Sequence, residues 1–431
     1  MTSQTQNLSR SRGRAPLVTL SGALPWLICT LFLLLMPLIF TSNSALTIMN
    51  QMAITIVFAL AYNMLLGQGG MLSFGHAVYM GMGGFMCVHL MNYVEDMSLP
   101  IPLPVLPIFG GLFGMGVALI VGSFSTRKAG TVFAMISLGV GELIAACSVI
   151  VVAFFGGEEG VSGDRTYGLP VFGIEFLHQI EVYYLTAFWL VLSALLMFLF
   201  SRTPIGRMAN AVRDNPERAE FLGYSARWVR FYSFVASGFF AGIAGGLFAV
   251  NYEILTEENL NLATSGSILL VTFLGGVGFF FGPIIGAILF TLLQTVLSLQ
   301  TEIWQLYLGV LFVATVMFFP GGLAGVIMMH ALPMRLGKAG LLIKPYFKTL
   351  VPAVISMAGV AAVLEILYHI RHAALGENEM TLFWVSFDSH SPLPLILAVV
   401  AMVAGFWLAR RGAPEMAEAW HKANTPDGGA V

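Results

Sequence analysis

The sequence predicts an all-α polytopic membrane protein with about 10–12 transmembrane helices. Of its 431 residues, 58% are hydrophobic and only 10% are charged, whereas soluble domains carry roughly 25% charged residues. The hydrophobic residues form continuous runs of about 20, the length of a transmembrane helix, and not the alternating segments of a membrane β-barrel. Lys and Arg number 20 against 22 Asp and Glu, a balance that disfavours nucleic-acid binding.

Uncharged stretches mark the predicted spans in order along the chain. The first apolar run is too long for the h-region of a signal peptide, so it is interpreted as an uncleaved span. Residues 15–94 contain no charged side chain, which leaves room for three helices. The predicted spans are 21–40, 46–66, 74–91, 105–124, 131–155, 183–200, 229–250, 265–280, 283–299, 303–319, 350–370 and 392–409.

The charged residues predict how these spans are oriented. With both termini in the cytoplasm, 18 of the 20 Lys and Arg lie in cytoplasmic segments, and 14 of the 22 Asp and Glu lie outside. This distribution agrees with the positive-inside rule. It requires an odd number of crossings between Asn261 and His330. Within that region, 265–299 is either two short crossings or a broken re-entrant hairpin.

The predicted organisation is a single membrane domain followed by an addition at the C-terminus. No phosphate-binding loop, metal-ligand cluster or catalytic constellation is found, so no catalytic, metal or cofactor site is expected in this chain. The predicted parts are a cytoplasmic tail at 1–20, a transmembrane domain at 21–330 with a large cytoplasmic loop at 201–228, a cytoplasmic linker at 331–349, an additional transmembrane pair at 350–410 and a cytoplasmic tail at 411–431.

The glycine-rich stretch between the second and third predicted spans is a candidate solute path. It reads GQGGMLSFGHAVYMGMGGF over residues 67–85. Glycine at this density permits broken helices, so freed backbone groups could line a path together with Ser73, Gly75 and His76. The alternative is tight packing, with Ser73 as the N-cap of the next helix and His76 as a buried, hydrogen-bonded histidine. Asn63 is a candidate for the path or for a hydrogen bond between helices.

Glu142 is a candidate for a role in the path or in gating because it lies within a predicted span, where a carboxylate is costly. The alternative is a protonated side chain bonded to a neighbouring helix. Glu365 and His369, four residues apart, suggest local pairing near a span end. Small residues that recur on one helix face predict close packing at Gly238, Gly242 and Gly246. Further glycines predict a helix break at Gly275, Gly276 and Gly282.

The segment RDNPERAEFLGYSARWVR, which begins at Arg213, predicts a short cytoplasmic helix at 216–222. Asp214 or Asn215 can act as the N-cap, Pro216 suits the first helical position and Gly223 suits the residue after the helix. A helix this short is marginal alone and needs a partner surface, for which Ala219, Phe221 and Leu222 offer small and apolar contacts.

The spacing Glu217-x-Ala219-x3-Gly223 matches the EAA loop of ABC importer membrane subunits. Over residues 45–325 the chain resembles the membrane subunits of branched-chain amino-acid ABC importers, the LivM type. The segments that carry this resemblance are NMLLGQGGMLSFGHAVYMGMGG, TVFAMISLGVGELI, EEGVSGDRTYGLP, RDNPERAEFLGYSARWVRFYSFVASGFFAGIAGGL, SGSILLVTFLGGVGFFFGPIIGAIL and FPGGLAG. Members of that family usually end soon after the last segment, whereas about 100 residues follow it here, with no assigned role.

The resemblance implies a multi-pass permease subunit of an importer in the bacterial inner membrane. A periplasmic binding protein would deliver the solute, a second homologous permease subunit would complete the channel within the lipid, and two cytoplasmic ATPases would bind ATP and Mg²⁺. The coupling residues would be Arg213, Glu217, Arg218, Ala219, Phe221, Leu222 and Gly223.

Two questions stay open at the level of sequence. The solute implied by the resemblance is a branched-chain or related neutral amino acid, with urea, an amide or an aromatic amino acid as alternatives. The alternative class of protein is an ion-coupled secondary transporter, in which Glu142 could relay a proton.

Overall fold

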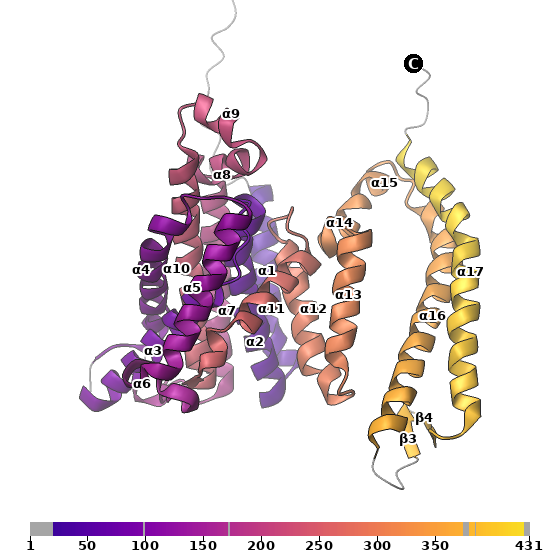
Figure 1. Cartoon of the computed structure of the whole chain (residues 1–431), viewed down its shortest axis with the longest axis horizontal. Helices are drawn as coiled ribbons and strands as arrows, with labels where there is room; N and C mark the ends of the chain where they lie inside the picture. The colour runs from indigo at the N-terminus through magenta and orange to yellow at the C-terminus, as the bar shows by residue number, and fades with distance from the viewer. Residues whose placement is uncertain (1–19, 98–99, 171–172, 374–378, 384, 426–431) are drawn as a thin grey trace, which may run out of the picture. The chain divides into compact units, whose positions relative to one another are not determined.

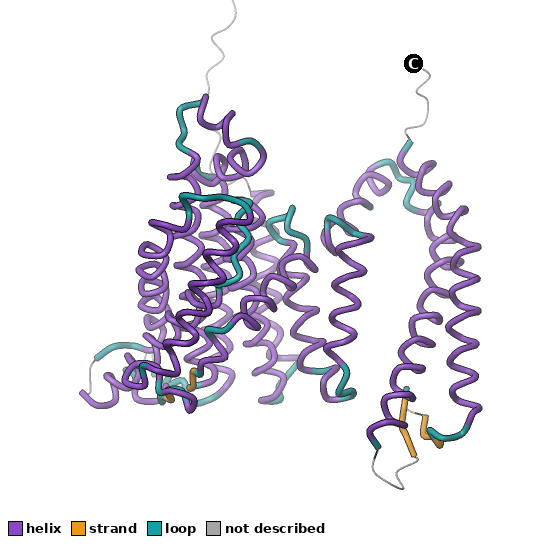
Figure 2. Tube along the Cα trace, viewed as in Figure 1, coloured by secondary structure: helices purple, strands orange, loops and turns teal. Residues whose placement is uncertain are grey.

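The computed structural model describes residues 20–97, 100–170, 173–373, 379–383 and 385–425. The described chain is built almost entirely of helices, which confirms the predicted all-α class (Figures 1 and 2). It forms two compact units, residues 1–291 (unit 1) and residues 292–431 (unit 2). Because the chain is apolar along most of its length, helices satisfy their own backbone hydrogen bonds where water is excluded.

Unit 1 contains the helices that correspond to the first nine predicted spans. Their bounds are α1 Leu20–Ile39, α2 Asn43–Asn63 continued by the π-helix η1 Met64–Gln68, α3 Ala77–Met97, α4 Leu106–Ser125, α5 Thr131–Ile150, α6 Val152–Phe155, α7 Gln179–Arg202, α8 Pro204–Asp214, α9 Pro216–Phe221, α10 Ala226–Tyr252, α11 Leu262–Gly275 and α12 Gly282–Thr295, which runs past the unit boundary. Two short antiparallel strands, β1 Val161–Ser162 and β2 Ile254–Leu255, and the 3-10 turns Leu103–Val105, Gly157–Glu159, Arg165–Tyr167 and Glu257–Asn259 complete it.

Every predicted span coincides with a helix, but not every helix is long and apolar enough to cross a membrane. Among the described residues eight helices meet that requirement, or nine if the pair Trp304–Phe318 and Gly322–Arg335, bent by 51°, is one span. Helices α3 and α11 are not among them; α11 has only 14 residues. The predicted span 131–155 ends earlier, at Ile150, because Val151 leaves helical geometry and α6 starts separately.

Helix α10 is the centre of unit 1 and packs against α2, α3 and α4. Its small residues make this possible, as the spacing of Gly238, Gly242 and Gly246 predicts. A Cβ atom at Gly242 would lie 3.0 Å from Gly111 Cα, and one at Gly246 would lie 2.8 Å from Pro107 Cα. A larger side chain at either position would therefore push α4 away from α10.

Helices α11 and α12 form an antiparallel hairpin that turns at residues 276–281. A Cβ at Gly286 would lie 2.7 Å from Gly275 N, and one at Gly275 would lie 2.9 Å from Pro283 Cα. The predicted helix break is therefore confirmed as a sharp turn between two helices, with Gly276 at a φ of 116°. Each helix has 14 residues and spans about 21 Å, less than the roughly 30 Å of a bilayer core.

Unit 2 is dominated by two long helices. Its elements are the 3-10 turn Leu297–Leu299, α13 Trp304–Phe318, α14 Gly322–Met329, α15 Ala331–Arg335, α16 Gly340–His372, α17 Pro392–Asn424 and the antiparallel strands β3 Glu379–Leu382 and β4 Val385–Asp388. Helices α16 and α17 lie side by side (Figure 1) and approach closely at Gly359 and Gly405, where a Cβ would lie 2.5 Å from Met402 N and 2.6 Å from Ser356 N.

Helices extend into the predicted linker and tail of unit 2. In the predicted linker at 331–349, α15 and the start of α16 are helical, and within the predicted tail at 411–431 α17 continues to Asn424. Glu365 does not depend on His369 for a partner: its Oε1 accepts a 2.7 Å hydrogen bond from the Tyr307 hydroxyl, while His369 Nδ1 lies 3.2 Å from Ser389 Oγ.

Candidate functional site

The α8–α9 segment lies at one end of unit 1, and the β1–β2 pair and α6 lie at the opposite end (Figure 1). Local signals define α9. The Asn215 side chain accepts a 3.0 Å hydrogen bond from Arg218 N, and Pro216 occupies the first helical position. Gly223 ends the segment with a φ of 86°, a conformation that residues with a Cβ rarely adopt. The predicted helix 216–222 is confirmed to within one residue, with Asn215 as its N-cap.

Ala219 does not offer its methyl group to a partner, contrary to expectation. It is 1% exposed and lies in a small hydrophobic core shared by α8, α9 and the start of α10. The other buried members of this core are Ala209, Val212, Ala226 and Val229. The small-residue side of α9 therefore faces its own chain, and this packing holds a helix that is too short to be stable alone.

The opposite side of the segment is exposed and apolar at its tip. Phe221 is 91% exposed and Leu222 67% exposed, and Glu217 and Arg218 are exposed beside them. Two large apolar side chains held outside the helical body by a preformed core are typical of a protein-binding surface. Arg213 behaves differently from these residues: its guanidinium points back into unit 1 and donates a hydrogen bond to the carbonyl oxygen of Gly67.

The candidate solute-path residues Ser73 and His76 are brought together, but inside the protein. Both are 0% exposed, so they do not line an open path within this single chain. His76 Nε2 lies 3.1 Å from Ser237 Oγ of α10, which donates a 2.6 Å hydrogen bond to Ala61 O. The His76 ring also stacks on Phe58, with centroids 5.7 Å apart. His76 is therefore a packed histidine with a hydrogen-bonding contact.

Ser73 is not the N-cap of the next helix, because α3 begins only at Ala77. Serine side chains from distant helices accept hydrogen bonds from the backbone N–H groups before and at this helix start instead. Ala77 N donates a 3.0 Å hydrogen bond to Ser265 Oγ of α11, and Phe74 N donates one of 3.0 Å to Ser137 Oγ of α5. The loop before α3 is thus held by three-dimensional contacts that no local sequence signal indicates.

Glu142 lies away from this buried loop. Helix α5 packs on the loop through glycine, since a Cβ at Gly141 would lie 3.1 Å from Gly75 Cα. The next residue, Glu142, is exposed on the far side of α5, between the exposed side chains of Met135 and Leu143. The structure therefore brings Gly75 together with Ser73 and His76, but places Glu142 on an outward face of a candidate span.

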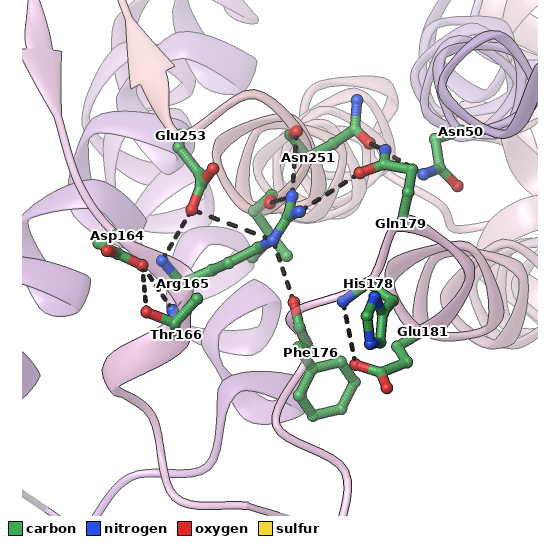
Figure 3. Close-up of polar contacts among 11 residues, drawn as sticks. Asn50, Asp164, Arg165, Thr166, Phe176, His178, Gln179, Glu181, Asn251 and Glu253 are labelled. Atoms are coloured by element: carbon green, nitrogen blue, oxygen red, sulfur yellow. Dashed lines mark hydrogen bonds and ion pairs between the residues drawn. The ribbon is translucent and has the colours of Figure 1, made fainter. Parts of the chain in front are cut away.

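Arg165 organises the opposite end of unit 1 and was not singled out from the sequence (Figure 3). Its side chain is 11% exposed. Its Nε donates to Phe176 O at 3.1 Å, and its two terminal nitrogens donate to Val250 O at 3.3 Å and to Gln179 Oε1 at 3.3 Å. The one available signal was its charge: Arg165 is one of only two basic residues on the predicted outer side.

This network fixes the end of α10 against two other helices. Asn251 Oδ1 accepts hydrogen bonds from Gln179 Nε2 of α7 at 2.8 Å and from Asn50 Nδ2 of α2 at 2.9 Å. Glu253, at a φ of 57°, accepts a 3.0 Å bond from the backbone N–H of Arg165. A guanidinium at the carbonyl end of a helix is favoured by the helix dipole. Arg165 therefore anchors this loop to α7 and to the end of α10.

Comparison with known proteins agrees with this architecture. Residues 44–320 match the family model described as the branched-chain amino acid transport system permease component. The high-affinity branched-chain amino acid transport system permease protein LivM of Escherichia coli (strain K12) is 27% identical over 303 residues, which cover 65% of this chain and 70% of the relative. LivM of Salmonella typhimurium is 26% identical over the same shares.

A second group of relatives matches a shorter stretch. The autoinducer 2 import system permease protein LsrC of Klebsiella pneumoniae is 36% identical over 118 residues, 26% of this chain and 34% of the relative. No solved structure matches the chain. The family match covers more than half of the 431 residues and contains α2, the glycine-packed α10, the α8–α9 segment and the α11–α12 hairpin. The chain therefore belongs to the branched-chain amino acid transport permease family and is a permease component of an ABC-type transport system.

Proposed function

We propose that this chain forms half of the membrane path of an ABC importer that takes up branched-chain or related neutral amino acids across the bacterial inner membrane. A second homologous permease subunit pairs with it, a periplasmic binding protein delivers the solute, and two cytoplasmic ATPases bind ATP and Mg²⁺. One observation carries the proposal: the α8–α9 segment, supported by a core around Ala219, presents Phe221 and Leu222 to the outside.

The tip of α9 is the ATPase-docking surface in this proposal. Docking buries Phe221 and Leu222 in an apolar groove, which lowers the free energy of the complex by about 25 cal/mol per Å² of apolar surface removed from water. The exposed Glu217 and Arg218 flank them and set the register through charge-assisted hydrogen bonds. Because α9 is already formed, docking does not have to order it, which reduces the entropic cost of association.

The second permease subunit covers the exposed face of α5. This face carries Glu142 midway along a 20-residue candidate span, and a carboxylate facing lipid at that depth is strongly unfavourable. Gly139, where a Cβ would meet nothing within 4 Å, leaves room for a close approach one turn away. The solute path then runs between the two subunits, with Glu142 as a polar group at or beside it.

The solute is assigned from the relatives. Both LivM proteins are branched-chain amino acid permeases by name and are aligned over 65% of this chain, whereas the LsrC proteins, named for autoinducer 2 import, are aligned over a third of it or less. The neutral amino acid is therefore favoured over other small polar solutes.

Substitution at Gly223 combined with crosslinking at Leu222 tests the docking surface. A Cβ at Gly223 would meet no other atom, but any residue here must adopt a positive φ. For a residue other than glycine this conformation costs roughly 1–2 kcal/mol, and relief of the strain would misalign the tip of α9. We expect Gly223→Val to reduce both uptake and solute-stimulated ATPase activity about tenfold. Gly116→Val is the matched control, because Gly116 also has free space but lies in regular helix α4.

A cysteine replaces Leu222, since Ala219 is buried, and we expect it to crosslink to the ATPase subunit in the assembled transporter. Normal transport by Gly223→Val, together with no crosslink from position 222 in any nucleotide state, would remove the assignment of this surface to ATPase docking.

A further inference from the structure

Arg213, the penultimate residue of α8, joins the α8–α9 segment to the end of α2. Helix α2 continues into the π-helix η1, whose wider turn displaces the regular hydrogen-bonding pattern: Met71 N donates to Leu65 O at 3.1 Å and Gly70 N to Leu66 O at 3.0 Å. The next carbonyl oxygen, that of Gly67, accepts its hydrogen bond from Arg213 Nη1 instead. A guanidinium at this carbonyl end also offsets the negative end of the helix dipole.

The Arg213 side chain is held along its whole length. Its Nε donates a 3.0 Å hydrogen bond to Asp214 Oδ1, which fixes the plane of the guanidinium. Its methylene groups lie against Gly70, where a Cβ would come within 2.6 Å of Arg213 Cγ and where φ is 64°. Both the space and the backbone conformation at Gly70 therefore require glycine. These contacts, from the methylene groups to the guanidinium, tie α8 to η1.

From η1 the contacts continue to the tip of the α11–α12 hairpin. A Cβ at Gly67 would lie 2.5 Å from Val277 O, and Asn63 Nδ2 donates a 3.2 Å hydrogen bond to Phe279 O. Both carbonyl oxygens, Val277 O and Phe279 O, belong to the 276–281 turn. Thus the turn of this hairpin rests on the same helical turn that Arg213 holds from the other side.

The region between Asn63 and His76 contains several unpaired buried polar atoms. Four buried side-chain atoms here have no hydrogen-bond partner among the described residues: Asn63 Oδ1, Gln68 Oε1, Ser73 Oγ and His76 Nδ1. An unsatisfied buried polar atom costs about 1–3 kcal/mol, so an arrangement of this region that pairs these atoms would recover part of that cost. A packed element with two arrangements of similar free energy is what a conformational switch requires.

We propose that Arg213 is a positioning residue that transmits the movement of the α8–α9 segment to the break between α2 and α3 and to the tip of the α11–α12 hairpin. This inference rests on the proposed ATPase docking of α9. It assigns Arg213 a role inside this chain rather than a contact with the ATPase. Loss of its hydrogen bond to Gly67 O uncouples ATP hydrolysis from movement of the path, and leaves docking intact.

The test uses the assembled transporter with cysteine at position 222. Arg213→Met keeps the approximate length and the apolar stem of the side chain and removes every hydrogen-bond donor. Arg213→Lys keeps the positive charge, but its ammonium group cannot bond Asp214 and Gly67 O at once as the planar guanidinium does. Arg207→Met is the matched control, since Arg207 is exposed on the same helix. We expect both Arg213 variants to crosslink to the ATPase as the parent does, and the solute transported per ATP hydrolysed to fall about tenfold for Met and less for Lys.

Three results would overturn the inference. If the Arg213 variants transport as much solute per ATP hydrolysed as the parent, Arg213 does not transmit movement of the α8–α9 segment to the break between α2 and α3. If they lose the crosslink while Arg207→Met keeps it, Arg213 acts on docking. If the parent with cysteine at 222 does not crosslink at all, the proposed docking fails first and the inference fails with it. If the Arg213→Met variant does not assemble, the Arg213→Lys variant decides alone. An unchanged amount of solute transported per ATP hydrolysed by Arg213→Lys is sufficient to reject the proposed role of Arg213.

Discussion

At the scale of single residues, Arg165 shows how one buried charged group fixes a loop whose described part contains only short 3-10 turns and a two-residue strand. Its side chain bonds the carbonyl end of α10, the start of α7 and the 156–178 loop at the same time. Charged hydrogen bonds are each worth about 1.5–3 kcal/mol when buried, and their loss leaves the acceptors unpaired. Such a side chain stabilises one arrangement of three segments rather than one contact.

We therefore expect Arg165→Met to lower the free energy of unfolding of the assembled subunit by about 3 kcal/mol and to make the 156–178 loop susceptible to protease. Arg371→Met is the control, because Arg371 is the other basic residue on the predicted outer side and is exposed. Thermal unfolding in detergent and limited proteolysis measure the two effects. Equal stability of the two variants would show that the Arg165 bonds contribute nothing net.

Glu142 gives the converse expectation, since it is exposed in this chain and we propose that it lies against the second permease subunit. Glu142→Leu is expected to leave the folding of the isolated subunit unchanged, because no contact within the chain is lost, and to reduce uptake. Glu142→Gln keeps the shape and hydrogen bonding and is expected to retain more uptake than the Leu variant. Uptake is compared at matched membrane abundance. Normal transport by both variants would mean that Glu142 has no role in the path or at the interface.

Residues differ in how far their environment can be inferred from sequence. The N-cap Asn215 and the positive φ of Gly223 are local features, and their sequence signals are reliable. The burial of Ala219 and the direction of Arg213 depend on α8, α10 and η1, which lie elsewhere in the chain. The sequence of α9 alone does not show how it packs on its neighbours, so Ala219 was assigned to a partner surface although it is buried within this chain.

At the scale of elements, the C-terminal addition forms a helical hairpin that also bonds to the elements before it, as between Tyr307 and Glu365. Helices α16 and α17 contact each other through glycines along their length, and the family match ends at residue 320, before either begins. Hydropathy predicted both helices, but α16 starts ten residues before the predicted span, since Lys344, Pro345 and Lys348 interrupt the apolar run there. A truncation that removes all of α16 must therefore be made before Gly340.

We expect removal of residues 338–431, which cuts at the Gly337 turn before α16, to leave most of the uptake intact. Removal of residues 292–431 is the control, since it also deletes α13 and part of the region that matches the family, and it is expected to abolish uptake. Uptake is measured at matched abundance in the membrane. Complete loss of uptake in the shorter truncation, with normal assembly, would place the α16–α17 hairpin in the transport mechanism.

At the scale of the whole molecule, the charge distribution predicts one orientation in the membrane. Eighteen of the 20 basic residues lie on the side that contains the α8–α9 segment if both termini are cytoplasmic. Within unit 1, α9 and α6 lie at opposite ends (Figure 1), so this orientation would place them on different sides of the membrane.

Cysteine labelling checks the orientation. We expect a cysteine at the exposed Glu158 to react with an impermeant reagent in intact cells, and one at the exposed Glu217 to react only after permeabilisation. Gly160 is unsuitable for this purpose because it has a φ of 74° and a Cβ there would lie 2.9 Å from Leu255 C. Labelling of position 217 from outside intact cells would reverse the orientation.

The family of transport proteins was inferred correctly from motifs that keep their order along the chain. For Ser73 and His76 the sequence left two alternatives, a path lining and tight packing, and in this conformation contacts from α5, α10 and α11 bury both residues completely. Motif order is a property of the sequence, but accessibility is a property of one packed conformation, and transport requires at least two.

The most direct test is uptake of radiolabelled leucine by proteoliposomes that contain this chain with its partner permease, the two ATPases and the binding protein. We expect uptake to require both ATP on the side of the α9 tip and the binding protein, and to continue when a protonophore is present. Uptake that proceeds without ATP and stops when the protonophore is added would contradict the importer mechanism and would identify an ion-coupled transporter.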